Sequence, residues 1–269
     1  MFHSTVVFVT GVSSGIGRIT ATQFAEQGCQ VFGTVRNLKT AQALANVTLV
    51  EMDVCDESSV SRAIQQVINQ ASRIDVLVNN AGVALVGAIE ESSLTEAQAI
   101  FDTNVFGILR TSKAVLPYMR QQGTGRIINV SSVLGFLPAP YMGLYAVTKH
   151  AVEGLSESLD HEVRQFGGRV ILVEPAFTKT TLDANSPHSA SKISAYDNER
   201  NKAALVINKN IAHAPDPSMV ARTIVEAATA SWQMRYQPKG QAALLSKLRR
   251  FMPSRLVDGS LRKSFGLSA

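Results

Sequence analysis

Cysteine, tryptophan and long apolar runs are all scarce in this sequence of 269 residues. The two cysteines, Cys29 and Cys55, lie far apart and lack the spacing of metal ligands, so a disulfide framework and a zinc site are not expected. No apolar stretch approaches the roughly 18 residues of a membrane span, and no signal peptide precedes the first strand-like run near Thr5. We therefore expect a soluble, cytoplasmic protein.

Excess charge of one sign is confined to the end of the chain. The formal net charge is +5, and from Lys239 onward seven basic residues stand against one acidic residue, Asp258. Because this tail has few aromatic residues, no nucleic-acid partner is expected. Residues 242–251 are basic and amphipathic, which leaves two alternatives: contact with an anionic membrane surface, or packing on the domain, which we prefer.

Short apolar runs recur before longer amphipathic stretches through most of the chain. This alternation is typical of a parallel sheet, and runs that are apolar throughout indicate helices on both faces. We therefore predict a doubly wound, mostly parallel α/β fold in three layers. The predicted strands are Val6 to Thr10, Gln30 to Val35, Val47 to Val54, Asp75 to Asn79, Arg126 to Ser131 and Arg169 to Glu174.

Apolar residues at three- and four-residue spacing predict the helices that connect these strands. No repeat or linker marks a second domain, so residues 1–269 are predicted to form one domain. Residues 177–213 lose their period and are interpreted as a mobile substrate-loop insertion; Asp216 then caps a helix that runs to about Ala230, and residues 239–269 form a basic extension. The predicted connecting helices are Ile16 to Gln27, Ser58 to Ala71, Thr95 to Arg120 and Tyr145 to Phe166.

A glycine-rich turn follows the first predicted strand. Thr10 to Gly17 has the sequence T-G-V-S-S-G-I-G and opens directly into a helix. Glycines allow a tight turn and a close approach to a pyrophosphate, while the helix N-terminus offers N–H groups and a positive dipole. The turn therefore predicts an anion site, although a glycine turn alone is weakly diagnostic. Its candidate contacts are Gly11, Ser13, Ser14, Gly15, Ile16 and Gly17.

Arginine stands where an acidic residue would select NAD(H). The second predicted strand ends just before Arg36, and a guanidinium binds phosphate oxygens in pairs, so Arg36 favours NADP(H) over NAD(H). The alternative is a lone surface arginine.

Asp53 and residues 79–82, N-N-A-G, end the next two strands at the edge where open α/β sheets bind ligands. For the latter, a simple strand-ending turn is the alternative.

A tyrosine and a lysine lie one helical turn apart. Tyr145 and Lys149 share a helix face, so the ammonium lies near the phenol. An ordinary tyrosine has a pKa of about 10, and an adjacent cation lowers that pKa, which makes Tyr145 a usable acid or base. Ser132, after the fifth strand, can stabilise charge on a substrate oxygen. A tyrosine and a lysine at this spacing usually lie on a solvated helix surface and have no catalytic role. A hydrolase is poorly supported, because neither Ser131 nor Ser132 lies in a G-x-S-x-G motif.

Together these motifs resemble the short-chain dehydrogenase/reductase family over about residues 5 to 180, which implies a Rossmann fold. The resemblance implies a tetrad in which Tyr145 transfers the proton, Ser132 orients the carbonyl, Lys149 binds the nicotinamide ribose and Asn104 holds a relay water. One departure is Ala176, where the family usually has glycine. The implied cofactor contacts after the glycine turn are Arg36, Asp53, Val54, Asn80, Ala81, Gly82, Tyr145, Lys149, Pro175, Thr178 and Thr180.

The residues predicted to line the substrate end are mostly apolar, which favours a hydrophobic ketone or aldehyde. Residues 34–37 and the basic extension resemble the branch of 17β-hydroxysteroid and retinol dehydrogenases. The apolar side of the helix from Tyr145 indicates core packing, whereas the family resemblance implies pairing of subunits in a homodimer or homotetramer. The predicted substrate contacts are Ser132, Val133, Leu134, Met142, Tyr145 and Phe177, with Phe136 and Leu137 beside them.

The sequence therefore predicts an NADP(H)-dependent oxidoreductase that interconverts a hydrophobic carbonyl compound and its alcohol, with Tyr145 as general acid/base and no metal. A non-catalytic protein that senses NADP(H) is the alternative. The presence of both Tyr145 and Lys149 argues against that alternative.

Overall fold

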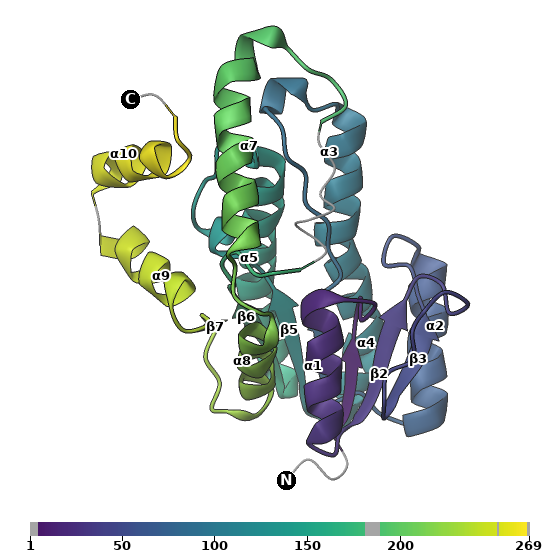
Figure 1. The fold of residues 1–269 in the computed structure, drawn as a ribbon. Helices are drawn as coiled ribbons and strands as arrows, with labels where there is room; N and C mark the ends of the chain where they lie inside the picture. The colour runs from purple at the N-terminus through teal and green to yellow at the C-terminus, as the bar shows by residue number, and fades with distance from the viewer. Residues whose placement is uncertain (1–4, 181–188, 252, 268–269) are drawn as a thin grey trace.

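The computed structural model describes residues 5–180, 189–251 and 253–267, which build a seven-stranded sheet (Figure 1). All neighbouring strands are parallel, in the order β3-β2-β1-β4-β5-β6-β7. The winding direction reverses between β1 and β4, which is where open α/β sheets bind ligands. The strands are β1 (Val6–Val9), β2 (Gln30–Val35), β3 (Val47–Glu51), β4 (Val76–Asn79), β5 (Gly125–Val130), β6 (Gly168–Val173) and β7 (Arg235–Tyr236).

Helices cover both faces of this sheet (Figure 1). α1 (Gly15–Glu26) and α8 (Ser218–Thr229) pack on one face. α2 (Glu57–Ala71), α4 (Gly107–Gln122) and α5 (Gly143–Val163) pack on the other. The predicted three-layer, doubly wound architecture is confirmed.

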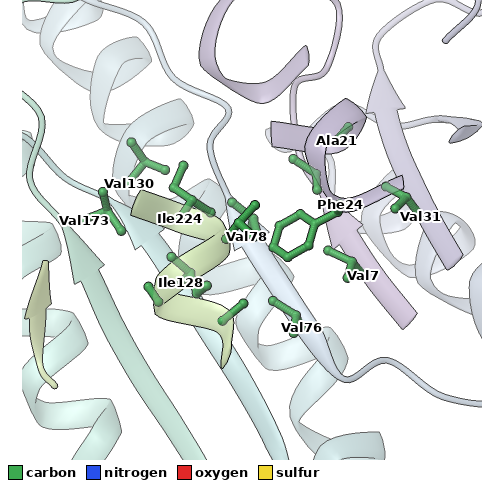
Figure 2. Packing of buried hydrophobic residues seen from close by; sticks show 14 of the residues in the cluster. Val7, Ala21, Phe24, Val31, Val76, Val78, Ile128, Val130, Val173 and Ile224 are labelled. Atoms are coloured by element: carbon green, nitrogen blue, oxygen red, sulfur yellow. The ribbon is translucent and has the colours of Figure 1, made fainter. Parts of the chain in front are cut away.

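Alternate residues of each strand enter two different cores. Val7 faces α1 and α8, while its neighbours Val6 and Phe8 face the helices of the opposite layer. Figure 2 shows Phe24 of α1 and Ile224 of α8 packed over the strands of the first core. Because both faces of the sheet are covered, the strands are apolar throughout rather than alternating.

The helix predicted over residues 95–120 contains a wider turn. α3 spans Leu94–Phe101 and α4 begins at Gly107, and the five residues between them, Asp102–Phe106, are π-helical. Apolar periodicity cannot reveal such a turn, because it shifts the spacing by a single residue. π-helical turns inside α-helices are frequent at functional sites, and this one contains Asn104.

Residues 177–213, where the sequence shows no apolar period, contain a helix in their second half, and their role as a substrate loop stays a prediction. α7 spans Asp197–Ala212, and only Ala203 and Ile207 of this helix are buried, so its apolar stripe is too narrow for a periodic signal. Residues 181–188 of the predicted insertion lie outside the described residues. The N-cap of α8 is Pro217 and not the predicted Asp216, but the Asp216 carboxylate, one residue earlier, accepts a hydrogen bond from the first amide of the helix, that of Ser218, at 2.8 Å.

Two helices follow β7 and run along one side of the molecule, α9 (Gln241–Phe251) and α10 (Ser254–Ser264) (Figure 1). Ala242 of α9 is buried, and Nε of Arg249 donates to the carbonyl of Phe136 at 3.2 Å. Phe265, just after α10, is buried against α7. The tail therefore packs on the domain. Within the described ranges, no helix is long and apolar enough to cross a membrane.

A buried aspartate joins the last turn of α5 to β6. The side chain of Asp160 is fully buried and accepts hydrogen bonds from Arg164 (2.6 Å), Arg169 (3.0 Å) and the amide of Val170 (2.9 Å). Burial alone would raise the pKa of this carboxyl, but the hydrogen bonds outweigh burial and hold the pKa below its ordinary value. The carboxylate therefore stays charged.

We expect Asp160→Asn to lower the free energy of unfolding by about 2 kcal/mol, because the two guanidinium groups lose their charged acceptor. Urea unfolding followed by circular dichroism measures this change. Glu162→Gln, an exposed substitution on the same helix, is the control and should change stability by less than about 0.5 kcal/mol. Equal stabilities of the two variants would contradict the anchoring role of Asp160.

Candidate active site

A cleft of about 510 Å³ opens at the carboxyl ends of the strands. Its volume suits an organic ligand of moderate size. Two predicted site residues do not line the cleft, Gly17 and Asn104. The lining also lacks Phe136 and Leu137, which were expected beside the substrate contacts. The predicted residues that do line the cleft are Gly11, Ser13, Ser14, Gly15, Ile16, Arg36, Asp53, Val54, Asn80, Ala81, Gly82, Ser132, Val133, Leu134, Met142, Tyr145, Lys149, Pro175, Phe177, Thr178 and Thr180.

The glycine turn brings the N-terminus of α1 to the cleft. Gly11 and Gly15 have positive φ angles of 71° and 57°, which glycine adopts without strain. A Cβ at Gly17 would lie 2.3 Å from both the Asn80 amide nitrogen and the Gly11 carbonyl oxygen. Because Ser14 does not cap α1 through its side chain, the first amides of the helix need another acceptor, which a pyrophosphate supplies. The turn therefore fits a dinucleotide.

Two threonines that the sequence analysis did not select hold this turn in place. Oγ1 of Thr34 accepts a hydrogen bond from the Gly11 amide at 3.1 Å, and Oγ1 of Thr10 accepts from the amides of Asn80 (3.0 Å) and Ala81 (2.9 Å). The Asn80 side chain donates back to the carbonyls of Thr10 and Gly11. A polar residue near the end of each of two apolar strands was the available signal.

The loop after β3 places Asp53 and Val54 at the same end of the cleft as Arg36, which is exposed. β3 ends at Glu51, earlier than the predicted Val54, because the Asp53 carboxylate accepts a hydrogen bond from the Cys55 amide at 2.9 Å and forms a turn. A cation and a carboxylate thus stand on neighbouring loops where the adenosine half of a dinucleotide would lie.

Tyr145 and Lys149 approach the opposite end of the cleft from α5. Nζ of Lys149 lies 5.6 Å from the centroid of the Tyr145 ring and donates to the carbonyl of Val130 at 2.8 Å. Ser132 follows β5; its hydroxyl accepts from the Leu134 amide at 3.1 Å and donates to the carbonyl of Pro175 over a long 3.4 Å. The end of β5 therefore positions both the lysine and the serine.

Asn104 is buried behind the cleft. Oδ1 of Asn104 accepts a hydrogen bond from the Val83 amide at 2.9 Å, and Nδ2 of Asn104 donates to the Val83 carbonyl at 2.8 Å. Nδ2 also donates to Oγ1 of Thr148 at 3.1 Å. Thr148 in turn donates to the carbonyl of Tyr145 at 2.7 Å. Asn104 thus ties the π-helical turn to the first turns of α5. The relay water expected at Asn104 stays a prediction.

The departure at Ala176 imposes no backbone strain. Among the described residues other than glycine, positive φ occurs at Asn46, Ser72 and Tyr141, and not at Ala176. The carbonyl of Ala176 accepts a hydrogen bond from Oγ1 of Thr178 at 2.9 Å. Alanine therefore fits the loop that follows β6.

A family model described as short chain dehydrogenase matches residues 5–191. The chain belongs to this family. A 3-ketodihydrosphingosine reductase of Bacteroides thetaiotaomicron is 43% identical over 180 residues, which cover 67% of this chain and 66% of that protein. Retinol dehydrogenase 8 of Bos taurus is 42% identical (66% and 60% covered), and human 17-beta-hydroxysteroid dehydrogenase type 1 is 38% identical (63% and 56%). The resemblance to this branch is confirmed, and the matched part spans two thirds or less of these relatives.

Solved structures of the short-chain dehydrogenase family superpose over nearly the whole chain. One from Streptomyces avermitilis has a TM-score of 0.83, 31% identity and 99% coverage of both chains. One from Burkholderia phymatum, solved with NAD, has a TM-score of 0.76, 28% identity and 92% coverage of both. A Burkholderia cenocepacia structure with NADP shares the fold at 22% identity, with a TM-score of 0.78 and 97% and 98% coverage. This short-chain dehydrogenase is thus an oxidoreductase that acts on CH–OH groups.

A pair of carboxyl groups lies behind the cleft of this dehydrogenase. Glu174, which precedes Pro175, is fully buried, and Nε of Arg235 lies 3.0 Å from its Oε1. Arg235 also contacts Glu153 of α5 at 3.1 Å, and the Gln237 amide donates to Glu174. Burial and the neighbouring Glu153 raise the pKa of Glu174 to about 7, despite Gln237 and Arg235.

This raised pKa predicts a pH-dependent effect of Glu174→Gln on stability. The native state holds a proton that the unfolded state has lost above about pH 4.5, so the stability that this proton supplies is present at low pH and is lost as pH rises through about 7. Glutamine stays neutral, so we expect the variant to raise Tm over wild type more at about pH 8.5 than at about pH 5.5. Calorimetry of both proteins measures this difference.

Glu157→Gln is the matched control, since exposed Glu157 also contacts Arg235. It should give no gain in Tm that grows with pH. A Glu174→Gln effect that is the same at both pH values would show that Glu174 titrates as an ordinary carboxyl.

Proposed function

We propose that this protein is an NADP(H)-dependent oxidoreductase that interconverts a hydrophobic ketone or aldehyde and its alcohol. The observation that carries this proposal is that Tyr145, Lys149 and Ser132 line the same cleft as the glycine turn and Arg36. The bound dihydronicotinamide supplies the hydride that the carbonyl carbon accepts.

Tyr145 is the proton donor in the direction of reduction. Its hydroxyl protonates the substrate oxygen, and the ammonium of Lys149, 5.6 Å from the ring centroid, stabilises the phenolate that remains. The carbonyl of Val130 holds this ammonium in place. In the direction of oxidation, the phenolate of Tyr145 takes the proton back from the alcohol.

Ser132 orients the substrate oxygen next to Tyr145. Its present acceptor, the carbonyl of Pro175, lies at 3.4 Å, the long end of hydrogen-bond distances. Turning the hydroxyl from this carbonyl to the substrate oxygen therefore costs little and provides a donor where negative charge develops.

Apolar side chains at the substrate end support a hydrophobic substrate. Leu134, Met142 and Phe177 line the cleft and belong, with Tyr145, to one apolar cluster. The relatives named above are a ketodihydrosphingosine reductase, a retinol dehydrogenase and a hydroxysteroid dehydrogenase. Their names agree with a large apolar carbonyl or alcohol.

Homo-oligomerisation is part of the proposal. On the apolar side of α5, Val152 and Val163 are buried in the core, as the sequence predicts. Exposed apolar side chains elsewhere on α4, its preceding turn and α5 support a contact between subunits; they are Phe106, Leu109 and Val147.

We expect Tyr145→Phe to lower kcat for NADPH-dependent reduction by about 100-fold or more, because the proton donor is lost, while NADPH still binds. The assay follows NADPH absorbance with a panel of aromatic, steroidal and aliphatic ketones and aldehydes. Tyr118→Phe, which removes an exposed hydroxyl bonded to Gln65, is the control and should keep full activity. If the wild type binds NADPH and turns over no carbonyl, the sensor hypothesis replaces this proposal.

Arg36→Leu should lower kcat/KM for NADPH by about 10- to 100-fold, because a charged hydrogen bond contributes about 1.5–3 kcal/mol. The value for NADH should change by less than about threefold, since NADH has no 2′-phosphate. Lys39→Leu, the same loss of charge on the same loop, is the control. Equal losses with both cofactors would contradict a contact between Arg36 and the 2′-phosphate.

A further inference from the structure

Apolar side chains are exposed along the outer side of the two C-terminal helices. Leu244, Leu248 and Phe251 recur at positions i, i+4 and i+7 of α9 and therefore lie on one side of it. They are 57%, 40% and 80% exposed, and Leu256 at the start of α10 is 58% exposed. We call these four residues, together with Lys247, Arg255 and Lys263, the tail face.

The opposite sides of both helices are already used for packing. In α9, Ala242 is buried and Arg249 bonds the carbonyl of Phe136. In α10, Leu261 faces the same apolar cluster as the buried Phe265, half a turn around from Leu256. The tail face therefore points away from the contacts that hold the tail on the domain. Singly exposed apolar residues are normal, but Leu244, Leu248 and Phe251 form a stripe along α9, and such a stripe marks a contact surface.

Charge selects the partner of the tail face. Lys247 lies one turn from Leu244, and Lys263 lies two turns from Leu256 on the same side of α10. In residues 239–251 and 253–267, the one acidic residue is Asp258. A second copy docked by twofold symmetry would bring this basic surface against itself, which is unfavourable. An anionic lipid surface attracts the cations and also accepts the apolar side chains.

We propose that the tail face binds an anionic membrane surface, with α9 and α10 lying in the interface and Leu244, Leu248, Phe251 and Leu256 inserted between the lipid headgroups. The packed side of α10, opposite the tail face, contacts the substrate end of the cleft, because Leu261 and Phe265 share an apolar cluster with Tyr145 and Phe177. The proposal is independent of catalysis.

Sedimentation of the full-length protein with vesicles tests the proposal. We expect binding to vesicles of phosphatidylcholine with roughly one third phosphatidylserine, at least tenfold weaker binding to pure phosphatidylcholine, and a loss of binding as salt is raised. The combined variant Leu244→Ser, Leu248→Ser and Phe251→Ser should weaken binding to the anionic vesicles at least tenfold. Lys247→Glu with Lys263→Glu should do the same without any change in apolar surface.

The matched control replaces three apolar residues that are as exposed but lie elsewhere. Ile89, Leu94 and Leu205 are 68%, 83% and 71% exposed, and their change to serine should leave vesicle binding unaltered. Retention of Tm in each variant shows that the fold persists. Wild-type binding no stronger than that of the tail variant, or equal on neutral and anionic vesicles, would overturn the proposal. The proposal would also be overturned if the wild type does not bind vesicles and the tail variant has a smaller oligomer mass in solution than the wild type. The tail face would then join two copies of the chain.

Discussion

The contact between Gly17, Asn80 and the carbonyl of Gly11 is the constraint on which the candidate site depends. Because Gly17 has no side chain, the first turn of α1 packs directly against the loop after β4. A Cβ at Gly17 would lie only 2.3 Å from the amide nitrogen of Asn80 and from the carbonyl oxygen of Gly11. This close approach lies where the winding of the sheet reverses, between β1 and β4, and brings the first turn of α1 to the cleft. The side chains of Asn80 and Thr10 then join the loop after β4 to the glycine turn through hydrogen bonds to backbone groups.

Helix α5, which carries Tyr145 and Lys149, is held by a second set of contacts. Asn104 and Thr148 attach the first turns of α5 to the π-helical turn, Lys149 attaches it to the end of β5, and Asp160 attaches its last turn to β6. Except for the bond from Thr148 to Tyr145, which lies within α5, these contacts join α5 to other elements of the fold. The position of Tyr145 therefore follows from the packing of four elements, and its helix alone would not fix it.

Local sequence patterns are sufficient to predict the layers, the strands β1 to β6 and the glycine turn. Apolar runs mark β1 to β6, and a turn that requires glycine has few alternatives. Three features escaped for physical reasons. α7 buries only Ala203 and Ile207, β7 has two residues, and the π-helical turn changes the spacing by one position. The roles of Thr10 and Thr34 depend on which strands are neighbours, and periodicity does not contain that information.

The two ends of the cleft differ in how strongly local sequence determines them. The cofactor end consists of loops that directly follow strands, so the order of the strands in the sheet places its residues. The substrate end combines Leu134, Met142 and Phe177 with Ala203 of α7 and Phe265 of the tail, from segments that lie up to about half the chain apart. Its shape depends on how α7 and the tail pack over α5. Changes in those two segments therefore act on the apolar cluster that includes Tyr145 and not on the loops that follow the strands, which is consistent with relatives that are named for different substrates.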